Sequence, residues 1–413
     1  MKKATKKKTA NKEAKRQTPE ETLHPIKREK STIIALALSA AVFIAALFCI
    51  YSQDILHGAG DIFTSAAEEQ IEFEKATVTE IANEDMTMDE VETGSYKGEQ
   101  ELSVIVKSGR YKNEEMVAYN YFGPLYGVPV EKGDSVVLTI KTNSDGEHSA
   151  TVYEFNRTPI LAIFVLLFFA VIIIVGGRTG LKSLLGLVFT VICLFAILIP
   201  LLLKGAPTIL TTFLMCGYIA FVCFTILGGI HRKTMSAFLG TFSGAFLAMV
   251  LGLAVQHFGK INGLRLEDAE PLLQMKYVGL TIDIKGLLVA GIIISALGAV
   301  MDIAMSISSA LEEVHAANPS LSRNELFKSG MNIGRDMAGT MTNTLILAFL
   351  GSEFTLMIFL YARGLTFYHL FATAFVALET ISGISCSIGL ILAIPLTALI
   401  SATLIAGSDH KKK

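Results

Sequence analysis

The residue of this chain with the clearest chemical potential is an aspartate inside an apolar stretch long enough to cross a lipid bilayer. Asp302 lies within GLLVAGIIISALGAVMDIAMSISSAL, residues 286–311. An unpaired carboxylate at membrane depth costs at least about 2.5–3.5 kcal/mol, so it normally faces protein or a water-filled path. Ser295, Ser306 and Ser309 share its helical face by their spacing. Asp302 is therefore either a site that takes up and releases a proton or ion, or a structural acid that hydrogen-bonds neighbouring helices.

A second group of polar residues opens a later apolar stretch, within GRDMAGTMTNT. Asp336, Thr340 and Asn343 are spaced i, i+4 and i+7 and so share one helical face. If that face meets the face of Asp302, carboxylate, amide and hydroxyl oxygens line one site. Such hard donors suit H⁺, Na⁺, Mg²⁺ or Ca²⁺ better than soft metals. The alternative for Asp336 is a place at the membrane interface, near the positive start of its helix.

The stretch 366–382 carries another acid, Glu379, and is too short to cross comfortably. We expect a re-entrant or interfacial helix that breaks at ISGIS, residues 381–385. Broken helices at membrane depth persist only where they are buried or line a cavity. We therefore assign Glu379 to the same polar cavity and leave out Glu353, which lies off the Asn343 face. The candidate ion- or substrate-binding residues are Asp302, Ser306, Ser309, Asp336, Thr340, Asn343 and Glu379.

Several classes of enzyme are disfavoured by missing motifs. The chain has neither a Walker-type phosphate-binding loop nor the HExxH zinc motif. Neither Asp302 nor Asp336 stands in the Gly-x-Gly-Asp or Tyr-Asp context expected around the acids of an intramembrane aspartyl protease. Methionines near Asp302 and Asp336 are better explained as packing residues than as copper ligands. We expect no enzyme activity, no cofactor, no bound metal and no nucleic-acid partner.

Composition indicates an α-helical polytopic membrane protein. Hydrophobic residues make up 52% of the chain, and tryptophan is absent. We predict about eight transmembrane helices, because each apolar run approaches the roughly 20 residues that a spanning helix needs. The predicted spans are 31–51, 159–175, 183–203, 207–227, 235–256, 286–310, 339–361 and 384–405. The first could instead be a signal peptide, but its long basic tail and the lack of an Ala-x-Ala site favour a retained anchor.

Short basic loops orient these spans. If the amino terminus is cytoplasmic, the predicted spans also place several basic segments in the cytoplasm. They contain Arg178 and Lys182, Arg232 and Lys233, and the carboxyl-terminal HKKK. The prediction is that both termini are cytoplasmic. The predicted organisation is a basic disordered tail (1–30), an anchor helix (31–51), an extracytoplasmic region (54–157), a multipass domain (158–406) and a basic tail (407–413).

The extracytoplasmic region 54–157 reads as a small β-rich domain. Five runs alternate apolar and polar residues: ATVTEI, ELSVIVK, MVAYNYF, SVVLTIK and ATVYEF. Turn signals such as Lys132-Gly133-Asp134 lie between them, which is typical of antiparallel strands. About five strands suit a small barrel or sandwich, for example an OB-like barrel. The region has no metal-ligand cluster and no nucleophile–base pair, so a packing or docking role is favoured over catalysis.

Three motifs of the membrane portion resemble a known family. They are GGRTGLKSLLGL (176–187), ALGAVMDIAMSISSALEEV (296–314) and NIGRDMAGTMTNTLILAFLG (332–351). The two longer ones place polar groups at fixed positions inside apolar helices, and together the motifs resemble the YibE/F family of bacterial multipass membrane proteins. The resemblance implies a bacterial cell-membrane protein with a preceding extracytoplasmic β-rich segment. It implies no particular biochemical activity or substrate.

Two functional hypotheses remain open. The first is a secondary transporter or permease that uses intramembrane carboxylates to couple transport of a small ion or solute to protons or cations. The second is a non-transporting envelope subunit whose β-domain binds a protein partner. Both place the chain in the lipid bilayer, and both leave a homo-oligomer open.

Overall fold

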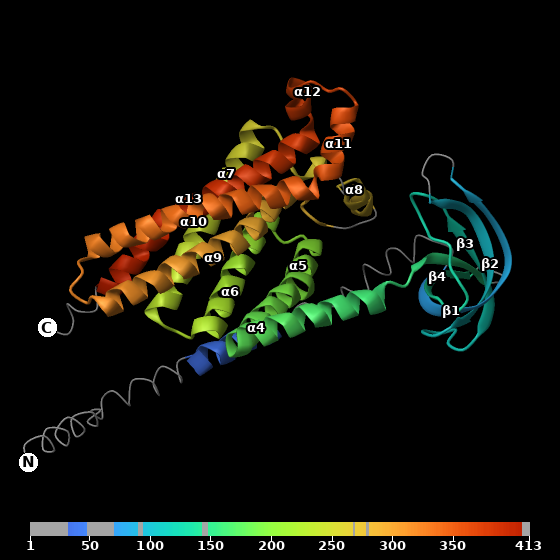
Figure 1. The fold of residues 1–413 in the computed structure, drawn as a ribbon, viewed down its shortest axis with the longest axis horizontal. Helices are drawn as coiled ribbons and strands as arrows, with labels where there is room; N and C mark the ends of the chain where they lie inside the picture. The colour runs from blue at the N-terminus through green and yellow to red at the C-terminus, as the bar shows by residue number, and fades with distance from the viewer. Residues whose placement is uncertain are drawn as a thin grey trace, which may run out of the picture. The chain divides into compact units, whose positions relative to one another are not determined.

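The computed structural model describes residues 32–47, 70–89, 94–142, 148–266, 269–277 and 281–406. The basic tails 1–30 and 407–413 lie outside these residues. The chain divides into two compact units, one formed by Met1–Gln53 with Gly176–Lys413 and the other by Asp54–Val175. Figure 1 shows the strands of the second unit and the helices of the first.

The second unit contains a closed five-stranded barrel. Its strands are β1 (Gln70–Met88), β2 (Tyr96–Val106), β3 (Glu115–Phe122), β4 (Ser135–Thr142) and β5 (His148–Phe155). They are hydrogen-bonded in the order β1-β2-β3-β5-β4, and β4 closes the barrel on β1. The β3–β5 contact is parallel and the other pairs are antiparallel. This is the arrangement of an OB-like barrel. The predicted small β-rich domain is confirmed, and of the two forms left open, barrel or sandwich, it is a barrel.

Strand alternation builds the barrel core. Leu102, Val104 and Val106 of β2 are fully buried, while the residues between them are half-exposed. Two polar side chains, Gln100 and Asn120, are also buried. Gln100 accepts a hydrogen bond from the Val130 N–H and donates one to the Val130 carbonyl, each 3.0 Å long. Asn120 donates to the Gln100 side chain at 2.9 Å, so this network fastens the loop after β3 to the barrel.

The helical unit is built from long apolar helices. Its first run of helical segments contains α4 (Thr158–Ile192), a π-helical segment (Cys193–Leu198) and α5 (Ile199–Leu203), and the part of α4 up to Val175 belongs to the second unit. It is followed by α6 (Thr208–Gly228), α7 (Arg232–Phe258), α9 (Leu287–Ala317), α10 (Arg323–Ser352) and α13 (Ala374–Ala406). The shorter helices are α8 (Ala269–Tyr277), α11 (Phe354–Ala362) and α12 (Phe367–Ala372). A further helix over Thr32–Leu47 packs on this unit, where the hydroxyl of Tyr218 donates to the carbonyl of Ser39 at 2.7 Å.

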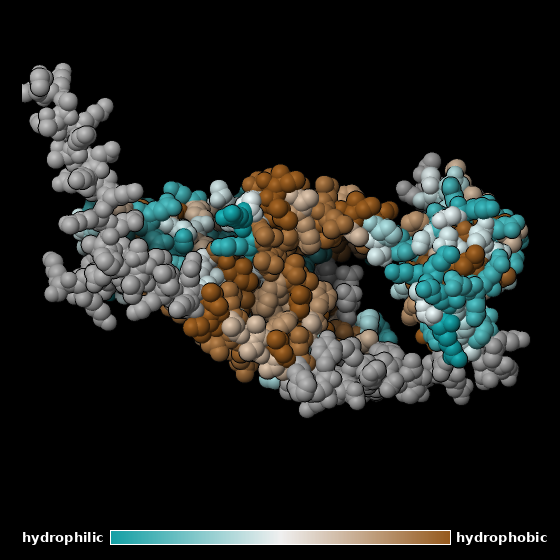
Figure 2. All heavy atoms as spheres, turned by 90° about the horizontal axis from the view of Figure 1, so that it is seen from below, coloured by the Kyte–Doolittle hydropathy of each residue, from teal (hydrophilic) through white to brown (hydrophobic). Residues whose placement is uncertain are grey.

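Five of the described helical segments are long and apolar enough to cross a membrane. A sixth is added if α10 and α11, which meet at an angle of 61°, form one bent span. The first of the five, Thr158–Leu203, has 46 residues, more than twice the roughly 20 that one crossing needs. Gly177 interrupts it with φ 54° and ψ −132°, next to the boundary between the two units. On the face shown in Figure 2, hydrophobic residues cover the middle of the helical unit.

The prediction for 366–382 is wrong in one respect. We expected a break at ISGIS, but α13 runs without interruption from Ala374 to Ala406. Gly383 lies inside this helix because it allows a close approach to α10: a Cβ built on it would lie 3.2 Å from the Phe349 ring. The glycine therefore serves helix packing rather than helix breaking, and tertiary contact overrides its low helix propensity.

Helices α7, α9, α10 and α13 lie side by side and form the centre of the unit (Figure 1). Glycines allow them to pack closely. A Cβ on Gly244 of α7 would lie 2.6 Å from Val300 of α9 and 2.7 Å from Ala393 of α13. A Cβ on Gly334 of α10 would lie 2.2 Å from Ile394 of α13. Backbones this close leave no room for even one methyl group.

Candidate functional site

Asp302 lies near the middle of α9 on the face that the other described helices leave uncovered. Its side chain is exposed, as is Ser295, while Ser306 and Ser309 are half-buried. A Cβ on Gly291 or Gly298 of the same face would meet nothing within 4 Å. The opposite face is the packed one, with Val300, Ile303, Ala304 and Ile307 fully buried. Among the described residues Asp302 has no hydrogen-bond or ion-pair partner, so the helical stripe predicted from spacing exists but binds nothing within the chain.

The polar face of α10 has the same character. Asp336, Thr340 and Asn343 are all exposed. Gly334, which packs on Ile394, precedes Asp336 by two positions and so points about 200° away from it around the helix. The Thr340 hydroxyl donates to the carbonyl of Met337 in its own helix at 3.0 Å. Within the described part of the chain, no hydrogen bond or ion pair joins this face to Asp302.

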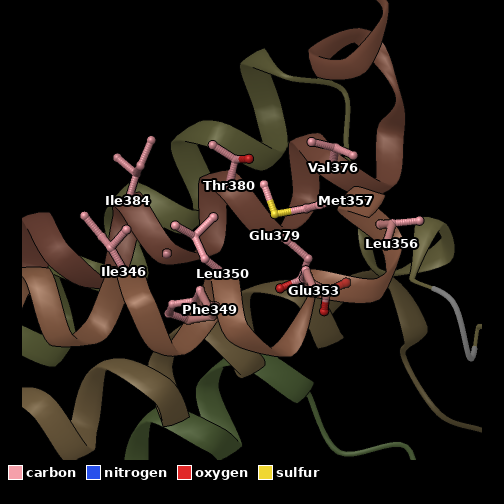
Figure 3. Close-up of a pocket in the computed structure, with 11 residues that line it drawn as sticks. Ile346, Phe349, Leu350, Glu353, Leu356, Met357, Val376, Glu379, Thr380 and Ile384 are labelled. Atoms are coloured by element: carbon pink, nitrogen blue, oxygen red, sulfur yellow. The ribbon is translucent and has the colours of Figure 1, made fainter. Parts of the chain in front are cut away.

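Glu379 lies elsewhere, in a cavity of about 270 Å³ where α10 and α11 meet α13. Figure 3 shows its carboxylate gathered with that of Glu353 at one side of this cavity. The other lining residues are apolar except for Thr380. They are Ile346, Phe349, Leu350, Leu356, Met357, Val376, Thr380, Gly383 and Ile384.

The cavity follows from the bend between α10 and α11. Glu353 ends α10 with φ −96° and ψ 11°, which lie outside the helical range, and α11 then departs at 61°. The bend separates α11 from the continuing line of α10. Helix α13 packs against α10 and contributes Glu379 from its second turn.

The electrostatics of this cavity are unbalanced. The charge of Glu353 acts on Glu379, and none of the residues that line the cavity is basic. Both carboxylates are half-buried, and two like charges in partly apolar surroundings repel each other more than they do in water. A proton or a cation shared between them relieves this repulsion. Among the described residues no group of three or more His, Cys, Asp or Glu side chains is placed to hold a metal ion, so such a cation would need further oxygen ligands such as water.

Comparison with protein-family models decides the relationship of the chain to known proteins. The model described as YibE/F-like protein matches residues 164–407, and the model of the YibE/F family N-terminal domain matches residues 71–155. The chain belongs to the YibE/F family. Comparisons with curated proteins and with solved structures give no match. Asp302, Glu353 and Glu379 all lie in the part matched by the first family model, and nearly the whole barrel lies in the part matched by the second.

The sequence patterns of this YibE/F chain do not predict that Glu353 and Glu379 line the same cavity. The sequence predicts Glu379 in one cavity with Asp302, whereas the structure places it beside Glu353, at the carboxyl-terminal end of α10. The signal that could have identified Glu353 is local. Gly351 and Ser352 precede it, and both have lower helix propensity than leucine or alanine, which marks a site where α10 can end.

A second cavity lies near the other end of α13. It has a volume of about 390 Å³ and is lined by Ile230, His231, Arg232, Met235, Glu312 and Leu404. Charged groups surround it: Lys233 forms an ion pair with Glu312 at 3.6 Å, and Arg232 donates to the carbonyl of Leu404 at 3.4 Å. Glu379 and Leu404 lie roughly 38 Å apart along α13 at about 1.5 Å per residue, so the two cavities are separated by more than the thickness of a bilayer core.

Proposed function

We propose that this YibE/F protein is a secondary transporter or permease of the bacterial cytoplasmic membrane, in which intramembrane carboxylates couple transport to protons or cations. The observation that carries the proposal is the pairing of Glu353 and Glu379 in one largely apolar cavity beside a bent helix. Discontinuous helices at substrate and ion sites are a recurrent feature of secondary transporters. A carboxylate pair there binds and releases a proton or cation as the surroundings open and close.

Asp302 is the third carboxylate of the proposed path. It lies exposed on the uncovered face of α9, outside the linings of both cavities. Thr340 and Asn343 present oxygens on the neighbouring helix α10. These polar stripes support a water-lined route, because lipid alone gives exposed Asp and Asn side chains no hydrogen-bond partner.

The proposed topology has eight crossings with both termini in the cytoplasm. The length of Thr158–Leu203 and its interruption at Gly177 support two crossings in that run, and the bent pair α10–α11 supports one. Single cysteines at Lys132 and Lys328, in a variant without native cysteines, test this topology. An impermeant maleimide is expected to label the first in intact spheroplasts and the second only after lysis; labelling of both in intact spheroplasts overturns it.

The proposal is tested by gradient-driven flux. The purified protein is reconstituted in liposomes that enclose a pH- or sodium-sensitive dye. A proton or sodium gradient is then applied across the liposome membrane, in the presence of each solute of a panel in turn. Wild type is expected to carry a gradient-dependent flux that Glu379→Gln and Asp302→Asn abolish. Glu313→Gln, which removes an exposed acid near the end of α9, is the matched control and is expected to keep wild-type flux. Equal flux in all four proteins excludes carboxylate coupling.

A non-transporting envelope subunit is the second candidate function. It is favoured by a different observation, the free surface of aromatic and acidic side chains on the β-barrel. If wild type carries no flux in the liposome experiment, this candidate becomes the leading one.

A further inference from the structure

Tyrosines and carboxylates stand side by side on the outer face of the barrel strands β1, β2 and β3. The backbone register pairs Asp85 with Glu99 and Glu99 with Tyr121, which makes one row across the three strands. In the next row Glu101 pairs with Tyr119. Residues directly opposite each other in antiparallel strands have Cβ atoms about 4.5–5.5 Å apart on the same face. We call these five residues the tyrosine–carboxylate surface.

This surface is open and its charges are free. Tyr119 is 44% exposed and Tyr121 is 52% exposed, while the residues between and beside them in β3 point into the barrel and are buried. Within the described part of the chain, Asp85, Glu99 and Glu101 take part in no ion pair. Lys97, the basic residue nearest to them on β2, forms its ion pair with Asp89 at 3.7 Å. The surface therefore keeps a net negative charge beside uncovered aromatic rings.

An apolar projection lies next to Tyr121. The chain leaves β3 through a tight turn in which the Gly123 N–H donates to the Tyr126 carbonyl at 2.7 Å. Leu125 at the tip of this turn is 96% exposed, and Tyr126 is 64% exposed. A leucine held this far into solvent by a hydrogen-bonded turn adds apolar contact area at the edge of the surface.

We propose that the tyrosine–carboxylate surface binds a basic, arginine- or lysine-rich segment of a partner protein. Carboxylates pair with guanidinium and ammonium groups, and tyrosine faces attract the same cations. OB-like barrels use the face of strands two and three to bind oligonucleotides. Here Glu99 and Glu101 occupy that face, and they repel phosphate groups, so charge complementarity favours a cationic partner over a nucleic acid. The inference goes beyond the proposed function and holds whether or not the helical unit transports.

The test is binding of defined probes to the full-length protein in detergent. The main probe is a short fluorescein-labelled peptide of alternating glycine and arginine, measured by fluorescence anisotropy at fixed ionic strength. The comparison probes are the same peptide with glutamate in place of arginine and a single-stranded oligothymidylate. The variants are Glu99→Lys with Glu101→Lys, and Tyr119→Ala with Tyr121→Ala. Glu131→Lys, an exposed acid in the loop after β3, is the matched control for a charge change elsewhere on the barrel.

The arginine peptide is expected to bind wild type and Glu131→Lys alike. The paired glutamate variant is expected to weaken its binding by at least about tenfold, and the paired tyrosine variant by several fold. The replaced side chains lie on the outer face of the barrel, so each variant is expected to unfold at the same temperature as wild type. An unchanged unfolding temperature excludes misfolding as the cause of weaker binding. The proposal is overturned if the tyrosine variant binds as wild type does, if Glu131→Lys weakens binding as much as the paired glutamate variant, or if the oligothymidylate binds more tightly than the peptide.

Discussion

Glu353, where α10 ends, and Glu379, in the second turn of α13, line the same cavity, and the charge of one acts on the other. If they share one proton or cation, they act as a unit. The variants Glu353→Gln and Glu379→Gln are then expected to lose flux to a similar extent, each by more than about tenfold. The double variant is expected to lose no more than either single one, since coupled residues are not additive. If the fold-loss of flux in the double variant equals the product of the two single losses, the two carboxylates act independently.

Asp302→Asn separates a transport role from a structural one. The carboxylate has no hydrogen-bond or ion-pair partner among the described residues, so its replacement is expected to change the free energy of unfolding by less than about 0.5 kcal/mol. Ser308→Ala is the comparison, because it removes a buried hydrogen bond of 3.0 Å to Ser401 of α13. That loss is expected to cost about 0.6 kcal/mol. Thermal unfolding in detergent measures both, and a large loss of stability in Asp302→Asn would indicate a structural acid.

Two glycines of α10 provide a matched test of helix packing. A Cβ on Gly334 would lie 2.2 Å from Ile394, whereas a Cβ on Gly339 would meet nothing within 4 Å. Gly334→Ala is therefore expected to destabilise the protein by about 1–3 kcal/mol through overpacking. Gly339→Ala is expected to be neutral or to stabilise it by up to about 1 kcal/mol through helix propensity. Equal thermal midpoints for the two variants would contradict the close contact of α10 with α13.

The buried amide network of the barrel makes a further prediction. Gln100→Leu removes the partner of the Val130 N–H, of the Val130 carbonyl and of one N–H of Asn120, which keeps its bond to the Val128 carbonyl; each group left unsatisfied is expected to cost on the order of 1–3 kcal/mol. Hydrogen exchange of the Val130 amide is expected to accelerate in this variant. Lys132→Gln, an exposed change in the same loop, serves as the control and is expected to leave the exchange rate as it is in wild type. Unchanged protection of Val130 in Gln100→Leu would exclude the network as the fastening of this loop.

Local patterns were enough to predict the parts of the structure that local spacing determines. Strand alternation predicted the small β-barrel, and i, i+4, i+7 spacing placed Asp336, Thr340 and Asn343 on one face of α10. The meeting of Glu353 with Glu379 depends on the 61° bend and on the path of α13, which no short pattern records. The same holds for Gly383, where a contact with Phe349 of another helix explains why α13 continues through a residue that favours helix ends.

The most direct test of carboxylate coupling is the charge displaced by the protein when the gradient changes. Proteoliposomes adsorbed on a solid-supported membrane are exposed to a rapid jump in pH or in sodium concentration, and the transient current is recorded without knowledge of the solute. Wild type is predicted to give a transient current that the double variant Glu353→Gln with Glu379→Gln lacks, while Glu313→Gln keeps it. Identical currents in wild type and the double variant, or no current from wild type under either jump, would contradict the account.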